Sequence, residues 1–190
     1  MREEIHVSTD VEADGPIPGP HSMLSFASVA YDSHGNELAT FAVNLKPLPD
    51  AKPHPATMAW WYKNPEAYAQ TKLNARDPED AMRDYKGWLL ALGAAPVFVG
   101  YPVAYDFMFV YWYLMRFVGE SPFSHSGWDV KTAASIALAC PYREVGKRRM
   151  PKEWFGPTRH AHEALADARE QGELHFNIRR ALGLTPEKTP

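Results

Sequence analysis

Alternating apolar and polar residues mark the first strand of the chain. From Ile5 to Val11, apolar or β-branched side chains recur at every second position, with polar side chains between them. This period of two is typical of a strand with one buried face. Two further runs, Met23 to Tyr31 and Leu38 to Leu45, are joined by Ser-His-Gly-Asn, which favours a turn. The pattern therefore predicts three strands in antiparallel succession.

Helical patterns follow these strands. A proline-rich connection leads to two short helical stretches, Met58 to Tyr62 and Glu66 to Leu73. Asp77-Pro78-Glu79 then supplies the cap, the proline and the acid that are typical of a helix start, and Gly93 is the expected end. A third, longer helix is therefore predicted, which starts at Asp77-Pro78-Glu79 and ends at Gly93.

The second half of the chain continues the alternation of strand and helix. Val97 to Tyr101 has the length of a buried strand, and Tyr105 to Val118 suits a buried helix. Asp129 to Ala139 predicts a strand end and a short helix. After a basic loop, Arg143 to Arg159, the stretch from His162 to Leu182 predicts a final helix. This order indicates an α/β fold in which helices flank a mixed sheet, an antiparallel meander with parallel strands added.

Length and charge limit the domain count and the partners. The 190 residues, 45% of them hydrophobic, suffice for one domain with a buried core. We expect residues 1–184 to form this domain and residues 185–190 to be a flexible tail. A net charge of -3 argues against a protein that coats nucleic acid with a broad basic surface. A short nucleic-acid end remains compatible, because metal ions can supply positive charge.

Cysteine content and hydropathy indicate the compartment. The single cysteine, Cys140, forms no internal disulfide, and the paired spacings of a zinc site are absent from the sequence. The sequence also lacks a secretory apolar segment and a run of membrane length. These features predict a cytoplasmic protein without a membrane partner.

Two acids near the end of the first strand are the first candidates for chemistry. Asp10 and Glu12 are two positions apart, so their side chains leave the strand on the same face. Neighbouring carboxylates repel each other, and a hard divalent cation between them relieves this repulsion. A solvated acidic pair is the alternative explanation of this spacing.

Two further regions carry a candidate acid or histidine. Asp106 lies among apolar residues where a strand gives way to a helix, and it is either a metal ligand or an acid that interacts with the helix dipole. Near the C-terminus, His162 and Asp167 lie among alanines, which leave room for a close approach of other elements. A cap or surface histidine is the alternative for His162.

Together these residues resemble the ordered motifs of the DEDDh 3′-5′ exonucleases, which have a ribonuclease-H-like fold. Asp10-Val11-Glu12, Asp106 and the segment HEALADA, similar to the family pattern H-x-A-L-x-D-A, occur in the family's order between residues 5 and 180. The resemblance implies that Asp10, Glu12, Asp106 and Asp167 bind two Mg²⁺ or Mn²⁺ ions. It also implies that His162 is the general base. His162 has the family's sequence spacing to Asp167, whereas His160 does not.

The activity implied is hydrolysis of the terminal phosphodiester bond at a 3′ end, which releases nucleoside 5′-monophosphates. The segment Met58 to Tyr62 with Glu66 is similar to small bacterial and phage exoribonucleases related to oligoribonuclease. This second resemblance implies a homodimer and slightly favours single-stranded or short RNA over DNA. Tyr101-Pro102 stands where the family usually has His-Asn, so the substrate contact of that asparagine is in doubt.

Several residues are candidates for contact with the substrate. The basic loop supplies Arg148, Arg149 and Arg159, which face either phosphates or solvent. The aromatic and apolar candidates are Trp60 and Trp61, which would stack a base, and Met23 and Leu24, which would form a wedge at the terminal nucleotide. Core packing or a subunit contact is the alternative for the tryptophans and is preferred for at least one of them. The start of a strand is the alternative for Met23 and Leu24. Asp129 is interpreted as a helix cap or as a group that supports a metal ligand, and not as a ligand itself.

Two other functions are compatible with the same features. One is a module that binds nucleic-acid 3′ ends without turnover, although a binding protein has no need of mutually repelling carboxylates. The other is a proofreading or accessory subunit that depends on a polymerase or nuclease partner.

Overall fold

A mixed five-stranded sheet forms the centre of the molecule in the computed structural model, which describes residues 4–156 and 163–185. The strands are β1 (Glu4–Ala13), β2 (Met23–Tyr31), β3 (Glu37–Asn44), β4 (Ala95–Gly100) and β5 (Gly127–Asp129), in the order β3-β2-β1-β4-β5. β1 pairs antiparallel with β2, as does β2 with β3, whereas β4 runs parallel to both β1 and β5. The predicted meander with added parallel strands is therefore confirmed.

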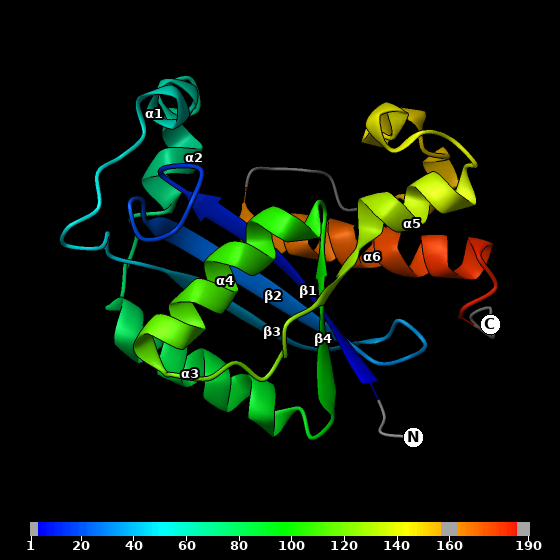
Figure 1. Ribbon diagram of the computed structural model, residues 1–190, viewed down its shortest axis with the longest axis horizontal. Coiled ribbons are helices and arrows are strands. Elements are labelled where there is room, and N and C mark those ends of the chain that lie inside the picture. Colours follow the sequence, from blue (N-terminus) through cyan, green and yellow to red (C-terminus); the bar gives the residue numbers. More distant parts are fainter. Residues whose placement is uncertain (1–3, 157–162, 186–190) are drawn as a thin grey trace.

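Helices cover both faces of this sheet (Figure 1). They are α1 (Pro55–Trp61), α2 (Pro65–Gln70), α3 (Pro78–Ala91), α4 (Val103–Phe117), α5 (Val130–Ala137) and α6 (Ala164–Ala181). α6 packs on β1 and β2 from one side, and α3 and α4 pack on the sheet from the other. α1 and α2 stand at one end of the molecule, and α5 stands at the other.

The central strand β1 presents different residues to its two sides. Ile5, Val7 and Val11 lie in the main apolar core together with side chains of α3 and α4. The intervening residues His6 and Ser8 face α6 and form hydrogen bonds to it. The predicted period of two is thus present, but both faces of β1 are covered.

The sequence pattern places the start of α4 at Tyr105, but the helix begins earlier, at Val103. The carboxylate of Asp129 accepts the backbone N–H of Val103 at 2.8 Å, and this bond stabilises the first turn of the helix. The connection from β4 is tight as well. A Cβ atom on Gly100 would lie 2.6 Å from the Cα of Val103, so a larger residue does not fit there.

The predicted helix caps are present. Asp77 accepts the backbone N–H of Glu79 at 3.0 Å, and Gly93 follows α3 with a positive φ of 75°. Asp129 accepts the backbone N–H of Thr132 at 2.6 Å, which confirms its interpretation as the cap of the short helix α5. Local sequence signals therefore define these helix ends well.

The C-terminal part differs in detail from the prediction. The expected basic loop contains three 3-10 helices, η1 (Tyr142–Glu144), η2 (Lys147–Arg149) and η3 (Lys152–Trp154). Thr185, the first residue of the expected tail, is buried and accepts a hydrogen bond from Arg179 at 2.8 Å. Residues 186–190 lie outside the described part of the chain. Within the described ranges, no helix has the length and apolar character needed to cross a membrane.

Candidate active site

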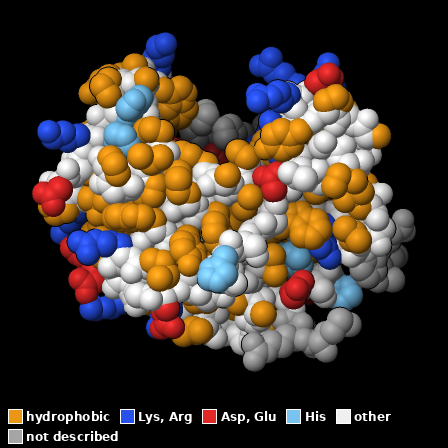
Figure 2. Space-filling model, in the orientation of Figure 1, with side chains coloured by type: hydrophobic (Ala, Val, Ile, Leu, Met, Phe, Trp, Pro, Cys, Tyr) orange, Lys and Arg blue, Asp and Glu red, His pale blue; other side chains and the backbone are white. Residues whose placement is uncertain are grey.

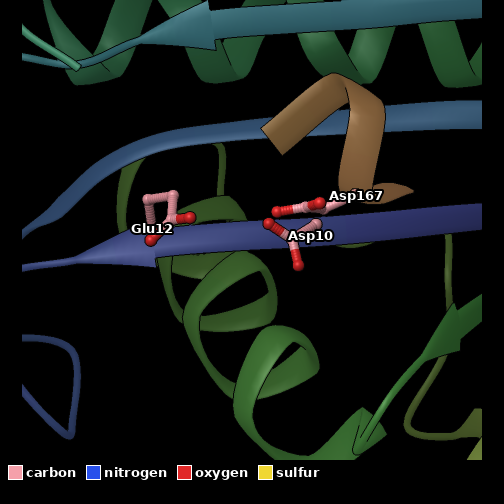
Figure 3. Close-up of side chains that lie close together, drawn as sticks. All are labelled: Asp10, Glu12 and Asp167. Carbon is pink, nitrogen blue, oxygen red and sulfur yellow. The ribbon is translucent and has the colours of Figure 1, made fainter. Parts of the chain in front are cut away.

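Three carboxylates converge where β1 meets the first turn of α6. Asp10 and Glu12 project from β1 and Asp167 projects from α6, and one ligand atom of each lies within 4.8 Å of the other two (Figure 3). Asp167 is buried, and the other two are partly buried. We call these three residues the acid cluster. The sequence prediction that acids distant in the chain come together is confirmed for this trio.

Asp106, the fourth predicted acid, lies beside the acid cluster and is held by β1. The ladder between β1 and β4 ends at the pair Ser8 and Val99, so the backbone N–H of Val11 extends beyond it. Asp106, in the first turn of α4, accepts this N–H at 3.1 Å. Its carboxylate therefore lies next to the residue between Asp10 and Glu12.

Burial and mutual repulsion perturb these acids. Burial, followed by the Asp167 carboxylate, raises the pKa of Asp10 to about 7. Burial and the carboxylates of Asp10 and Asp167 raise the pKa of Glu12 to about 9. Burial and the charge of Asp10 also raise the pKa of Asp106 well above its ordinary value. A divalent cation would remove this repulsion and favour the ionised forms, so the residues present fit a site for hard metal ions.

The register between α6 and β1 sets the position of Asp167. Four residues of a helix rise about 6.0 Å, and two residues of a strand rise about 6.6 Å, so the two spacings nearly match. Gln171 accordingly bonds to Ser8 at 3.0 Å, and His175 bonds to His6 at 3.1 Å. Asp167 lies one helical turn before Gln171, and it meets Asp10 of β1. We call this series of contacts the ladder between β1 and α6.

Gln171 connects α6 to two strands of the sheet. Its side-chain amide lies 3.0 Å from Ser8 Oγ, 3.1 Å from the carbonyl oxygen of Thr9 and 3.0 Å from that of Val99. It therefore links α6 to β1 and to β4 at once, in a buried environment. Sequence analysis missed it. The signal was the spacing of four between Asp167, Gln171 and His175, set against the spacing of two between the polar residues of β1.

The apolar substrate candidates divide into buried and exposed residues. Met23 and Leu24 are buried at the start of β2, so their proposed role as a wedge is wrong and the alternative of a strand start is confirmed. Trp61 is buried as well, and its indole N–H donates to the carbonyl of Ala13 at 3.0 Å. Trp60 is 39% exposed and remains a candidate for stacking. The expectation that at least one tryptophan serves the core is confirmed by Trp61.

The predicted basic and histidine residues are placed only in part. Arg148 and Arg149 are exposed, and Arg149 forms an ion pair with Glu144 at 2.6 Å. His162 and Arg159 lie outside the described residues, so the role of His162 as general base stays a prediction. Tyr101-Pro102, which replaces the usual His-Asn, is a cis peptide before α4.

In Figure 2 a notch separates the end that carries α1 and α2 from the end that carries α5 and the 3-10 helices. Figure 1 shows the start of α6, the helix that carries Asp167, between these two ends. Clustered carboxylates on the central strand of a mixed sheet, facing a helix that packs on it, are the arrangement expected of metal-dependent nucleases with a ribonuclease-H-like fold.

Comparison with known proteins gives the family. No family model matches the chain. The chain is 33% identical over 176 residues to the 3′-5′ DNA exonuclease Cap18 of Escherichia coli, and the match covers 90% of each protein. The chain therefore belongs to the DEDDh-type 3′-5′ exonucleases, whose members are metal-dependent phosphodiester hydrolases.

Solved structures support the fold. The nuclease domain of 3′hExo, a DEDDh family member bound to rAMP, has a TM-score of 0.70 at 11% identity, with 97% of this chain and 96% of that chain covered. E. coli exonuclease I in complex with a dA16 oligonucleotide has a TM-score of 0.65 at 17% identity. That match covers 94% of this chain but only 41% of exonuclease I. S. pombe Pop2p, in a form with Mg²⁺ and Mn²⁺ bound, has a TM-score of 0.63 at 16% identity.

Proposed function

We propose that this exonuclease removes nucleotides from the 3′ end of single-stranded DNA with the help of two Mg²⁺ or Mn²⁺ ions. The observation that carries the proposal is the acid cluster of Asp10, Glu12 and Asp167, with Asp106 beside it. Oxygen-only ligands favour these hard cations over zinc. When bound, a pair of such ions supplies a nucleophilic water at neutral pH and offsets negative charge on the phosphate.

The protein's own residues have distinct parts in this proposal. Asp10, Glu12, Asp106 and Asp167 hold the ions, and rigid elements, β1, α4 and α6, hold these side chains in place. His162 takes a proton from the attacking water. The water oxygen forms a bond to phosphorus, and the bond to the 3′ oxygen of the preceding nucleotide breaks. That oxygen takes up a proton from solvent to become the new 3′ hydroxyl, and a nucleoside 5′-monophosphate leaves.

DNA replaces RNA as the proposed substrate. The slight preference for RNA came from the likeness of Met58 to Tyr62 to exoribonucleases, whereas the relative with 33% identity is named a DNA exonuclease. Exonuclease I, a structural neighbour, is in complex with single-stranded DNA. Trp60, exposed on α1, offers a ring on which a base can stack irrespective of its sequence.

Assembly, domain limits and location complete the proposal. A homodimer is proposed from the resemblance to oligoribonuclease relatives. Residues 1–184 are proposed to act as one exonuclease domain. A cytoplasmic location is proposed because the single cysteine, Cys140, gives no internal disulfide.

The decisive assay uses single-stranded DNA and RNA oligomers labelled at either end, incubated with Mg²⁺, with Mn²⁺ or with a chelator. We expect stepwise shortening of 5′-labelled DNA, release of mononucleotide from 3′-labelled DNA, and loss of both in chelator. Binding of the 3′ end without shortening would indicate the alternative, a binding module. Faster shortening of RNA than of DNA would overturn only the proposal that the substrate is DNA, and the exonuclease activity itself would stand.

A further inference from the structure

One basic residue of the segment that carries the 3-10 helices differs from its neighbours. We call residues 141–156 the basic segment. Arg143, Arg148, Arg149 and Lys152 are exposed on it. Lys147 is half-buried, and its Nζ lies 3.1 Å from Oε2 of Glu170, a buried acid of α6. The basic segment therefore directs one ammonium group inward, toward α6.

Glu170, the partner of this ammonium, lies on the same helix as Asp167 of the acid cluster. Glu170 follows Asp167 by three residues on α6, which places the two side chains on neighbouring turns of one helix face. The ion pair between Lys147 and Glu170 therefore lies beside the turn of α6 that carries Asp167.

The position of Lys147 is fixed by apolar anchors. Val145 and Met150, on either side of η2, are buried in a core cluster with Leu174 of α6. Farther along, the carbonyl of Trp154 accepts a hydrogen bond from Asn177 at 2.8 Å. The segment forms one wall of the notch in Figure 2, where Lys and Arg side chains gather. A cation held in this way loses little conformational entropy when it meets an anion.

We infer that Lys147 binds a phosphate of the DNA strand beside the metal ions, with Glu170 as its positioning residue. The inference rests on the proposed function. An ammonium has three N–H donors, and the ion pair with Glu170 uses one of them, while the Tyr101 ring lies 5.8 Å from the Lys147 nitrogen. A backbone phosphate in the notch would be the next strong acceptor within the reach of this side chain.

A purely structural role for Lys147 predicts something different. If the lysine only offsets repulsion among the acids, its removal leaves the substrate site intact and changes the affinity for metal ions. Neutralising a cation beside a metal site should then strengthen Mg²⁺ binding, and saturating Mg²⁺ should abolish any defect. A phosphate contact instead gives a defect that persists at saturating Mg²⁺.

The test compares Lys147→Gln with the matched control Lys86→Gln. Lys86 is ion-paired with Glu120 and similarly exposed, but it lies on α3, which packs on the opposite side of the sheet from α6. At saturating Mg²⁺ on single-stranded DNA, we expect kcat/KM of Lys147→Gln to fall roughly tenfold or more, as for a lost charge-assisted hydrogen bond. The plot of log kcat/KM against log salt concentration should become shallower by about 0.7.

Other outcomes overturn the inference. A loss no greater than that of Lys86→Gln, or a loss that disappears as Mg²⁺ is raised, would show that Lys147 does not bind the strand. Lys147→Arg, which keeps the charge, should recover most of the lost activity, and thermal melting should confirm that each variant is folded. If the wild type itself shows no Mg²⁺-dependent shortening, the proposed function fails, and it fails independently of Lys147.

Discussion

The two faces of β1 have opposite character, although they belong to one strand. On the face toward α3 and α4, Ile5, Val7 and Val11 are buried in the apolar core. On the face toward α6, the side chains are His6, Ser8, Asp10 and Glu12. The first face stabilises the sheet by apolar burial. The second gains less from burial, because its polar groups must be paired or ionised in a confined space.

The difference shows that the residues that stabilise the fold and the residues that carry the chemistry lie on opposite faces of β1. The ladder between β1 and α6 begins with a buried histidine pair, continues with Gln171 and ends in the acid cluster. The polar groups of this ladder therefore change along its length from imidazole and amide groups to carboxylates. The apolar face on the other side of β1 has to offset the cost of gathering these carboxylates.

The largest effect should come from Asp10→Asn or Asp167→Asn. Each variant removes a charged ligand from the acid cluster, which is worth several kcal/mol of transition-state stabilisation, or about a thousandfold or more in kcat. The metal-free protein should melt at the same temperature or higher, because a mutually repelling charge is lost. Single-turnover rates with Mg²⁺ and thermal melting measure the two effects.

Asp80→Asn, at an exposed acid of α3, is the control for these variants and should retain full activity. Wild-type turnover in either acid-cluster variant would refute the assignment of metal ligands.

A substitution in the apolar core should lower the stability of the fold and leave kcat nearly unchanged. Phe26→Ala removes a fully buried ring that packs against Tyr85 and Phe41, and it should cost about 3–5 kcal/mol of stability. At a temperature where the variant is folded, its kcat should remain near that of the wild type. Denaturant unfolding together with kinetics tests this, and a large fall in kcat of the folded variant would show that the two faces are not separable.

Gln171→Leu should lower both the stability of the fold and the activity, each to an intermediate degree. The carbonyl oxygens of Thr9 and Val99 would lose a donor, at a cost of about 1–3 kcal/mol. Displacement of Asp167 should lower activity or metal affinity by about 10–100-fold, the range seen for groups that orient metal ligands. A Mg²⁺ titration of the rate measures this effect.

Ser8→Ala is the companion variant, because it removes one acceptor and keeps both carbonyl contacts of Gln171. It should be milder in both stability and Mg²⁺ dependence. Equal defects in the two variants would contradict the role given to the amide.

The smallest effect concerns pH. The pKa values of Asp10 and Glu12, about 7 and about 9, exceed the values of about 4 expected in an unfolded chain, so the folded state binds protons more tightly. In metal-free protein, the stability from this source is present at acidic pH and is lost as pH rises through these folded values. Since Mg²⁺ requires ionised ligands, the increase in Tm on adding Mg²⁺ should grow between pH 6.5 and 9.

The histidine pair should not interfere in this window. Burial, followed by the charge of Arg179, lowers the pKa of His6 to about 4, and burial, followed by His6, lowers that of His175. Their contribution to stability is present above the unfolded value of about 6.5 and is lost as pH falls below it. A Mg²⁺ effect on Tm that shrinks from pH 6.5 to 9 would contradict the account of the acids.

Local patterns were enough to predict most of the fold. The alternation in β1, the cap at Asp77 and the apolar run of α4 each depend on neighbouring residues, and each is present in the structure. The convergence of Asp10, Glu12 and Asp167 came from a family resemblance, because periodicity gives the face on which a side chain lies but not the element that packs against it.

Residues whose roles depend on long-range register were not predictable. Trp60 and Trp61 are neighbours in sequence, and only the docking of α1 decides which of them is buried. Lys147 is one of several basic residues in its segment, and its contact with Glu170 depends on how that segment anchors on α6. The spacing of four that relates Gln171 to Asp167 and His175 does not identify its partners, because its three acceptors lie on two distant strands.

The central claim is that the acid cluster binds divalent cations. Crystals grown with Mn²⁺ and measured for anomalous scattering test it directly. The account predicts two peaks, with carboxylate oxygens of Asp10, Glu12 and Asp167 within about 2.5 Å of them. An anomalous map without a peak at these side chains, from crystals of wild-type protein saturated with Mn²⁺, would contradict it.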